Sequence, residues 1–302
     1  MRKLFTILAV LILVLVIAVG TFRFLRPGED IPLPPGVPEP TEILQPDWCP
    51  DVEVIAAPGT WESAPGDDPF HPTANEYSFM LSITRPLQER FPAEDVRVWT
   101  LPYTAQFRSI QAQHEMTYDD SRQEGQAVLE TEMVTMHDEC PYTDFILAGF
   151  SQGAVILGDV ASQIGQGGGV VPADRIRGVA LIADGRREPG VGQVPGTLVS
   201  GVGAEVALQP LNLLVQPIVP GATMRGPRVG GFGELQDRVW DICAPNDSIC
   251  DAPRQVGNAL ERAQALVAAN GVHALYASNP DVIPGTTANA WVVEWASDLI
   301  HQ

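Results

Sequence analysis

The chain has 302 residues, of which 45% are hydrophobic and 18% are charged, so it can bury a proper core and is not a disordered protein. Its formal net charge is −19 at pH 7. This acidic balance argues against a nucleic-acid partner, because binding to phosphates requires a basic face.

The N-terminus carries a run of apolar residues over 4–22 that is interrupted only by Thr6 and Thr21. Such a run is long enough to span a bilayer as a helix. The alternative is a cleaved signal peptide that ends near Gly20. Residues 1–26 therefore predict a membrane anchor or a signal peptide, and in both cases an extracytoplasmic protein. Residues 27–46 contain seven prolines and predict a semi-rigid linker.

The remainder, 47–302, alternates predicted strands and helices. Short apolar runs predict five strands, at 52–57, 96–102, 145–148, 177–183 and 238–242. Helical spacing predicts helices within 74–90, 121–140, 154–160, 254–269 and 287–300, the first of them kinked by Pro86. This alternation is typical of one α/β domain with a parallel sheet.

One long insertion, 184–237, separates the fourth strand from the last. It is rich in Gly, Pro and Val, and a connection of this length in a compact domain is usually functional. Its apolar middle, 204–220, predicts a cover or an acyl-chain groove beside the site. The alternative is an inert packed segment.

The sequence Gly149-Phe150-Ser151-Gln152-Gly153 lies between a predicted strand and a predicted helix. Gly-x-Ser-x-Gly in this setting indicates a nucleophile elbow, in which small residues permit a very tight turn and the Ser stands at the helix N-terminus. Ser151 is therefore the candidate nucleophile. The alternative is an ordinary serine in a strand-to-helix turn.

A serine nucleophile needs a His base, which a carboxylate orients. In α/β hydrolases the acid and then the His follow the Ser in the chain. His273 fits this order, whereas the other four histidines precede the Ser or lie at the terminus: His71, His114, His137 and His301. Asp247 follows the last predicted strand and is the candidate acid, ranked ahead of Asp241 and Asp251.

The oxyanion of an acyl-transfer intermediate needs two hydrogen-bond donors. One candidate is the N–H of Gln152, which follows the nucleophile. The other is Thr60, because Gly59 allows the backbone to approach closely after the first strand. The alternative for Thr60 is a simple turn.

The four cysteines allow two bridges in an oxidising compartment. Cys243 and Cys250 close a short loop around Asp247 and are the most favoured pair, which leaves Cys49 with Cys140. A zinc site is disfavoured, because the chain has no Cys-x₂-Cys motif and no clustered His.

Together, Gly-Phe-Ser-Gln-Gly at 149–153, Gly59-Thr60, Cys-x₃-Asp-x₂-Cys at 243–250 and His273-Ala-Leu-Tyr276 resemble the cutinase family of serine esterases. The resemblance covers roughly residues 48–300 apart from the insertion. The N-terminal run, the linker and Asp184-Gly-Arg-Arg187 look more like the membrane-anchored cutinase-like lipases and thioesterases of mycobacteria and corynebacteria. Small plant-pathogen cutinases lack the insertion, so cutin is a doubtful substrate.

The resemblance implies a three-layer α/β/α fold with a five-stranded parallel sheet and a Ser151–Asp247–His273 triad. It also implies the bridges 49–140 and 243–250 and oxyanion contacts from Thr60 and Gln152. The implied activity is that of a lipase, phospholipase or thioesterase on long acyl chains of the cell envelope, without a metal or another cofactor. An envelope acyltransferase that uses the same acyl-enzyme and a non-catalytic envelope-binding module are the alternatives.

Overall fold

The computed structural model describes residues 45–254 and 271–302. From Gln45 onward the described residues belong to one compact unit. The predicted anchor or signal peptide over 1–26, most of the linker and most of the helix predicted at 254–269 lie outside the described residues. Within the described ranges, no helix is both long and apolar enough to cross a membrane.

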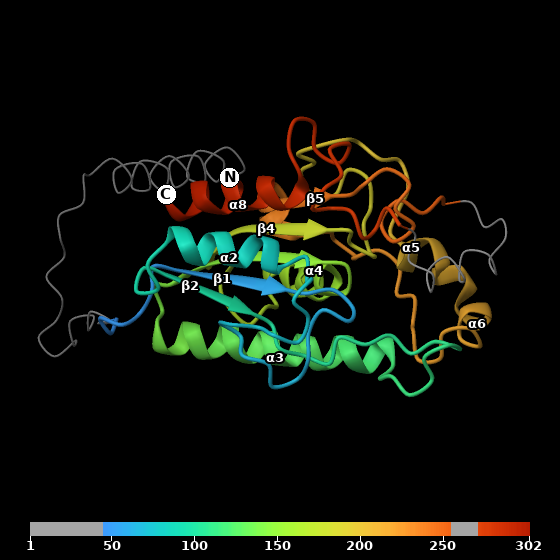
Figure 1. The fold of residues 1–302 in the computed structure, drawn as a ribbon, viewed down its shortest axis with the longest axis horizontal. Coiled ribbons are helices and arrows are strands. Elements are labelled where there is room, and N and C mark those ends of the chain that lie inside the picture. The colour runs from blue at the N-terminus through green and yellow to red at the C-terminus, as the bar shows by residue number, and fades with distance from the viewer. Residues whose placement is uncertain (1–44, 255–270) are drawn as a thin grey trace, which may run out of the picture. The chain divides into compact units, whose positions relative to one another are not determined.

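The five predicted strands form one parallel sheet, as predicted, in the order β2-β1-β3-β4-β5 (Figure 1). The strands are β1 (Val52–Ala57), β2 (Val96–Thr100), β3 (Asp144–Phe150), β4 (Ile176–Ile182) and β5 (Val239–Ile242). All residues of the interior strand β1 are buried, because it has neighbouring strands on both sides and helices on both faces. The carboxyl ends of β1 and β3 lie side by side, which brings the two loops of the predicted site together.

Helices cover both faces of the sheet and complete the predicted three-layer α/β/α fold (Figure 1). Within the part of the chain that the structure describes, the four long helices are α2 (Leu81–Arg90), α3 (Tyr118–Glu139), α4 (Gln152–Gly165) and α8 (Ala288–Ile300). Helices α2 and α8 pack in one apolar core with the side chains of one face of the sheet. Helices α3 and α4 pack in a second core on the opposite face. The chain from β1 to α8 therefore folds around both faces of a single sheet.

The helix predicted at 74–90 begins only at Leu81. The preceding residues are held in turns by polar side chains: Asn75 accepts from the N–H of Tyr77, and Glu62 accepts from the N–H of Phe79. Such local bonds compete with a helix. Pro86 lies inside α2 and does not divide it into two elements.

The insertion between β4 and β5 is mostly irregular and contains short helical pieces. These are α5 (Ala204–Leu208), η2 (Gln209–Leu211), α6 (Asn212–Val215) and η3 (Gly233–Arg238). Leu208, Val215 and Val219 pack in a small apolar cluster. Leu213 and Leu214 are instead 89% and 59% exposed, so only part of the apolar segment 204–220 is buried.

Both cysteine pairs form disulfides, Cys49–Cys140 and Cys243–Cys250. The first joins the residues that precede β1 to the end of α3. It lies at the amino ends of the strands, away from the predicted site at their carboxyl ends. The second closes the loop that follows β5. Only the second disulfide is therefore close to the predicted site.

Candidate active site

The turn from β3 to α4 places Ser151 in an unusual backbone conformation, with φ 55° and ψ −118°. A non-glycine residue occupies positive φ only where the surroundings impose it. Both flanking glycines are required sterically. A Cβ at Gly149 would lie 2.7 Å from the carbonyl oxygen of Gly153, and a Cβ at Gly153 would lie 2.0 Å from that of Ala57. The Gly-x-Ser-x-Gly pattern thus forms the sharp elbow predicted from the sequence.

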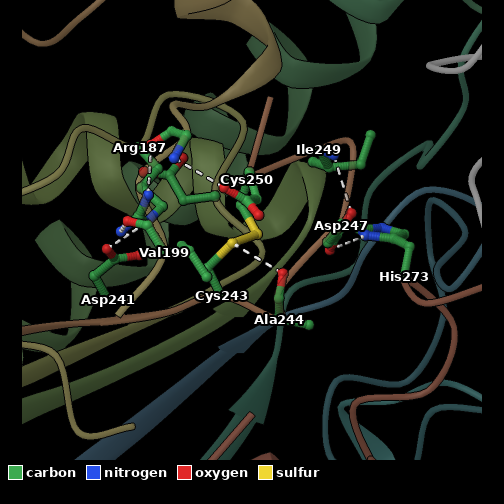
Figure 2. Close-up of a disulfide and its surroundings, with 12 residues drawn as sticks. Arg187, Val199, Asp241, Cys243, Ala244, Asp247, Ile249, Cys250 and His273 are labelled. Carbon is green, nitrogen blue, oxygen red and sulfur yellow. Dashed lines mark hydrogen bonds and ion pairs between the residues drawn. A yellow bond between two sulfur atoms is a disulfide. The ribbon is translucent and has the colours of Figure 1, made fainter. Parts of the chain in front are cut away.

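His273 lies between Ser151 and Asp247, the two partners predicted for it. Its Nε2 is 3.0 Å from the Oγ of Ser151, and its Nδ1 is 2.9 Å from an Oδ of Asp247. Figure 2 shows Asp247 and His273 facing each other on one side of the Cys243–Cys250 disulfide. The imidazole also stacks on the ring of Phe150, with centroids 4.9 Å apart. The three side chains come from three separate segments of the chain and form one continuous hydrogen-bonded series.

Asp247 is fully buried, and further hydrogen bonds hold its carboxylate in place. One oxygen accepts from the hydroxyl of Tyr276 at 2.8 Å and the other from the N–H of Ile249 at 2.9 Å. Burial and the nearby Asp247 raise the pKa of Tyr276, so this phenol stays protonated and continues to donate. Sequence reasoning assigned no role to Tyr276, although it lies three residues after His273 in the quoted motif.

The alternative acids have other partners. Asp241 forms an ion pair with Arg187 at 2.6 Å on the other side of the disulfide (Figure 2). Asp251 accepts from the backbone N–H of Gly201 at 2.8 Å. Of the three candidates, Asp247 is the one that contacts His273.

The two predicted oxyanion residues are linked to each other. The hydroxyl of Thr60 donates to the side-chain oxygen of Gln152 at 3.2 Å, and the amide nitrogen of Gln152 donates to Ser121 at 3.0 Å. Gln152 is the first residue of α4, so its backbone N–H has no acceptor within the helix. The loop after β1 and the N-terminus of α4 are therefore held together beside Ser151.

Glu62 fixes the loop that carries Thr60, a role that sequence reasoning did not identify. Its carboxylate accepts from the N–H of Gly59 at 3.1 Å, the hydroxyl of Ser78 at 3.1 Å and the N–H of Phe79 at 2.9 Å. Burial raises the pKa of Glu62, and these hydrogen bonds oppose the rise. The sequence signal that could have revealed this role is the position of Glu62, two residues after Thr60.

A pocket of about 380 Å³ opens beside Ser151. One side, here called the triad wall, comprises Ser151, His273 and their neighbours Phe150, Ala274 and Tyr276. The other side, here called the insertion wall, comprises Gly185, Ala204, Glu205 and Met224. Phe107, Tyr118 and Val155 lie in the lining as well. This volume is typical of sites that enclose most of a small organic ligand.

The side-chain types that bind metal ions do not cluster in the described part of the chain. Among residues 45–254 and 271–302, no group of three or more His, Cys, Asp or Glu side chains is placed to hold a metal ion.

Comparison with known proteins gives a family match over most of the chain. The family model described as Cutinase matches residues 48–292. The chain is also 69% identical, over an alignment of 306 positions, to a protein of Corynebacterium glutamicum named Carboxylesterase Culp6 homolog. That alignment covers 99% of each protein.

Solved structures resemble the fold at low sequence identity. An acetyl xylan esterase matches with a TM-score of 0.52 and 15% identity, and covers 83% of this chain and 99% of its own. A cutinase-like protein from Cryptococcus sp. matches with a TM-score of 0.51 and 18% identity, and covers 85% of this chain and 98% of its own. At these identities the structures support the α/β fold alone.

Proposed function

Since this chain belongs to the cutinase family and is a serine carboxylic ester hydrolase, we propose that it works through a triad of Ser151, His273 and Asp247. The observation that carries the proposal is the series of hydrogen bonds from Ser151 Oγ through both ring nitrogens of His273 to Asp247. It provides a nucleophile, a base and a group that orients the base. The related Corynebacterium protein is named a carboxylesterase, in agreement with this chemistry.

In the first half-reaction, Ser151 Oγ attacks the ester carbonyl carbon while His273 Nε2 takes the hydroxyl proton. Asp247 accepts from Nδ1, which fixes the tautomer and stabilises the imidazolium that forms. The tetrahedral intermediate collapses when the bond to the alcohol breaks, and His273 returns the proton to the leaving oxygen. The products of this half-reaction are a free alcohol and an acyl-Ser151 ester.

In the second half-reaction, His273 removes a proton from water, and the hydroxide attacks the acyl carbon. The bond to Ser151 Oγ then breaks and the serine recovers its proton, which releases the acid. The N–H of Gln152 and the Thr60 loop supply the oxyanion donors in both halves. Their mutual hydrogen bond at 3.2 Å supports this assignment, because donors that are already in place need no reorganisation during the reaction.

The proposed substrates are esters with long acyl chains, as found in lipids of the cell envelope. The support is the pocket of about 380 Å³, much of whose lining is aromatic or aliphatic. The proposed location is extracytoplasmic, which agrees with two disulfides and no free cysteine among the described residues. The proposed membrane attachment through residues 1–26 rests on the sequence.

Replacement of Ser151 tests the proposal. We expect Ser151→Ala to lower kcat on p-nitrophenyl esters by about 10⁴-fold or more and to abolish labelling by a fluorophosphonate probe. Circular dichroism of both proteins checks that the fold is retained. Full turnover in a folded Ser151→Ala protein would overturn the assignment.

The reaction direction is tested in the same assay by the addition of a long-chain alcohol. Hydrolysis alone gives free acid. Transfer of the acyl group to the alcohol, at the expense of free acid, would favour the acyltransferase alternative.

A further inference from the structure

Two polar side chains of the pocket lining, Tyr118 and Glu205, have no part in the proposed catalytic chemistry. Tyr118 comes from the start of α3, and Glu205 comes from α5 in the insertion. The two residues are only 7% and 3% exposed, and the hydroxyl of Tyr118 donates to Glu205 at 2.6 Å. A buried hydrogen-bonded pair in the wall of a ligand pocket is the kind of feature that fixes a ligand's orientation.

Helix α3 carries both Tyr118 and a residue that contacts the neighbour of Ser151. Ser121 lies three residues later on the same helix and accepts from the side chain of Gln152, the neighbour of Ser151. Residues three apart in a helix share one face, with Cβ atoms about 5–6 Å apart. Tyr118 therefore lies one helical turn before Ser121, and it lines the same pocket as Ser151.

The hydrogen bonds of Glu205 leave it little capacity for a ligand. Besides Tyr118, one of its oxygens accepts from Nη2 of Arg225 at 2.8 Å. The other accepts from Nε of Arg225 at 2.9 Å and from its backbone N–H at 3.2 Å. A carboxylate offers about four acceptor positions, so Glu205 is saturated.

The hydroxyl of Tyr118, by contrast, donates its proton in the hydrogen bond to Glu205, and its oxygen keeps its acceptor lone pairs. Burial and the adjacent Glu205 raise the pKa of Tyr118, so the phenol remains protonated in the pocket. The pair can thus accept a hydrogen bond from a ligand. The pair has no free hydrogen-bond donor for an anionic ligand, and the negative charge of Glu205 repels such a ligand.

We infer that Tyr118, held by Glu205, is a specificity-determining residue that accepts a hydrogen bond from a hydroxyl group on the acyl chain of the substrate. The inference rests on the proposed function, since it concerns the same pocket. It narrows the substrate class to neutral esters of hydroxylated acyl chains. A plain chain leaves the acceptor lone pairs of the buried phenol oxygen unpaired, although its hydroxyl still donates to Glu205, and is therefore a poorer substrate.

The test compares a straight-chain p-nitrophenyl ester with a matched series in which one hydroxyl group is moved stepwise along the acyl chain. For the native enzyme we expect kcat/KM to be highest at one hydroxyl position, by about fivefold over the plain ester. In Tyr118→Phe we expect this ratio to fall to about one. Glu205 keeps its three bonds to Arg225 in that variant, so its charge stays paired.

A matched control makes the same chemical change away from the pocket. Tyr142 is 53% exposed, lies outside the pocket lining and precedes β3, so Tyr142→Phe should keep the native ratio. An equal ratio in native enzyme and Tyr118→Phe, or no preference at any hydroxyl position, would overturn the inference. Loss of all turnover in Ser151→Ala would then still support the triad, so the two proposals fail separately.

Discussion

The two walls of the pocket are held in place by different forces. The triad wall rests on the sheet: Phe150 and Tyr276 belong to one large apolar core, and a disulfide closes the loop that carries Asp247. The insertion wall rests on a smaller apolar cluster that includes Met224 and, in addition, on buried ion pairs. Apolar packing fixes a surface through many weak contacts, whereas buried ion pairs fix it through a few directional bonds that fail when one partner is lost.

Asp159 of α4 is the centre of the ion pairs behind the insertion wall. Its carboxylate binds Arg186 and Arg228 at 2.8 Å each, and Arg225 as well. Arg225 also forms an ion pair with Glu205, which lines the pocket. Burial alone would raise the pKa of Asp159, but the three guanidinium groups lower it to about 2. The insertion wall is thus attached through charges to α4, the helix that follows Ser151.

The largest expected effects come from removal of the disulfides. Loss of the disulfide near the site should lower both catalysis and stability, whereas loss of the other should lower stability alone. We expect Cys243→Ser with Cys250→Ser to lower kcat by about 10²-fold, because the loop that positions Asp247 is no longer closed. The free energy of unfolding should fall by about 2–3 kcal/mol, since the closed loop is short. Ester kinetics and urea unfolding measure the two quantities.

The matched control is Cys49→Ser with Cys140→Ser. Its cysteines are 91 positions apart, so its free energy of unfolding should fall more, by about 4–5 kcal/mol, while kcat of the folded enzyme is retained. An equal loss of kcat in both double variants would mean that the short disulfide has no special part in positioning Asp247.

The triad wall was predictable from the sequence because its signals are local. Apolar runs predicted the strands of the sheet, and Gly149 and Gly153 around Ser151 predicted the tight turn that their steric surroundings require. The chain order of nucleophile, acid and base then selected Asp247 and His273, and in the structure His273 contacts Ser151 while Asp247 contacts His273.

The insertion wall was not predictable in this way. Asp159 and Arg225 are 66 positions apart in the chain, and each residue alone reads as an ordinary surface charge. Glu62 was missed for the same reason, because its role depends on Phe79, 17 positions away. The apolar segment 204–220 was singled out by its composition, and Ala204 and Glu205 at its start line the pocket, whereas Leu213 is exposed.

Loss of Asp159 should destabilise the protein strongly. Asp159→Asn leaves three guanidinium groups near a neutral amide, and removal of one partner from a buried ion pair costs about 3–5 kcal/mol. Urea unfolding measures the change. Because the insertion wall loses its attachment, kcat/KM should fall more for long-chain than for short-chain esters.

The control for this variant is Asp174→Asn, since Asp174 is exposed on the short helix η1 (Ala173–Arg175). Its free energy of unfolding should change by less than about 0.5 kcal/mol. A loss of under about 1 kcal/mol in Asp159→Asn would contradict the view that charges hold the insertion wall.

The same carboxylate should make the insertion wall sensitive to acid. The pKa of Asp159 is about 2 in the folded protein and near its ordinary value of 3.8 in the unfolded chain, so the unfolded chain binds the proton more tightly. The stabilisation is therefore fully present above pH 3.8 and is lost as the pH falls through 2. It amounts to about 2 kcal/mol.

Urea unfolding of the native protein and of Asp159→Asn from pH 6 to pH 2 isolates this carboxylate, because all other titrating groups are shared. The difference in free energy between the two proteins should shrink by about 2 kcal/mol over that range. A constant difference would mean that Asp159 has its ordinary pKa, and that its hydrogen-bond geometry rather than its charge holds the insertion against α4.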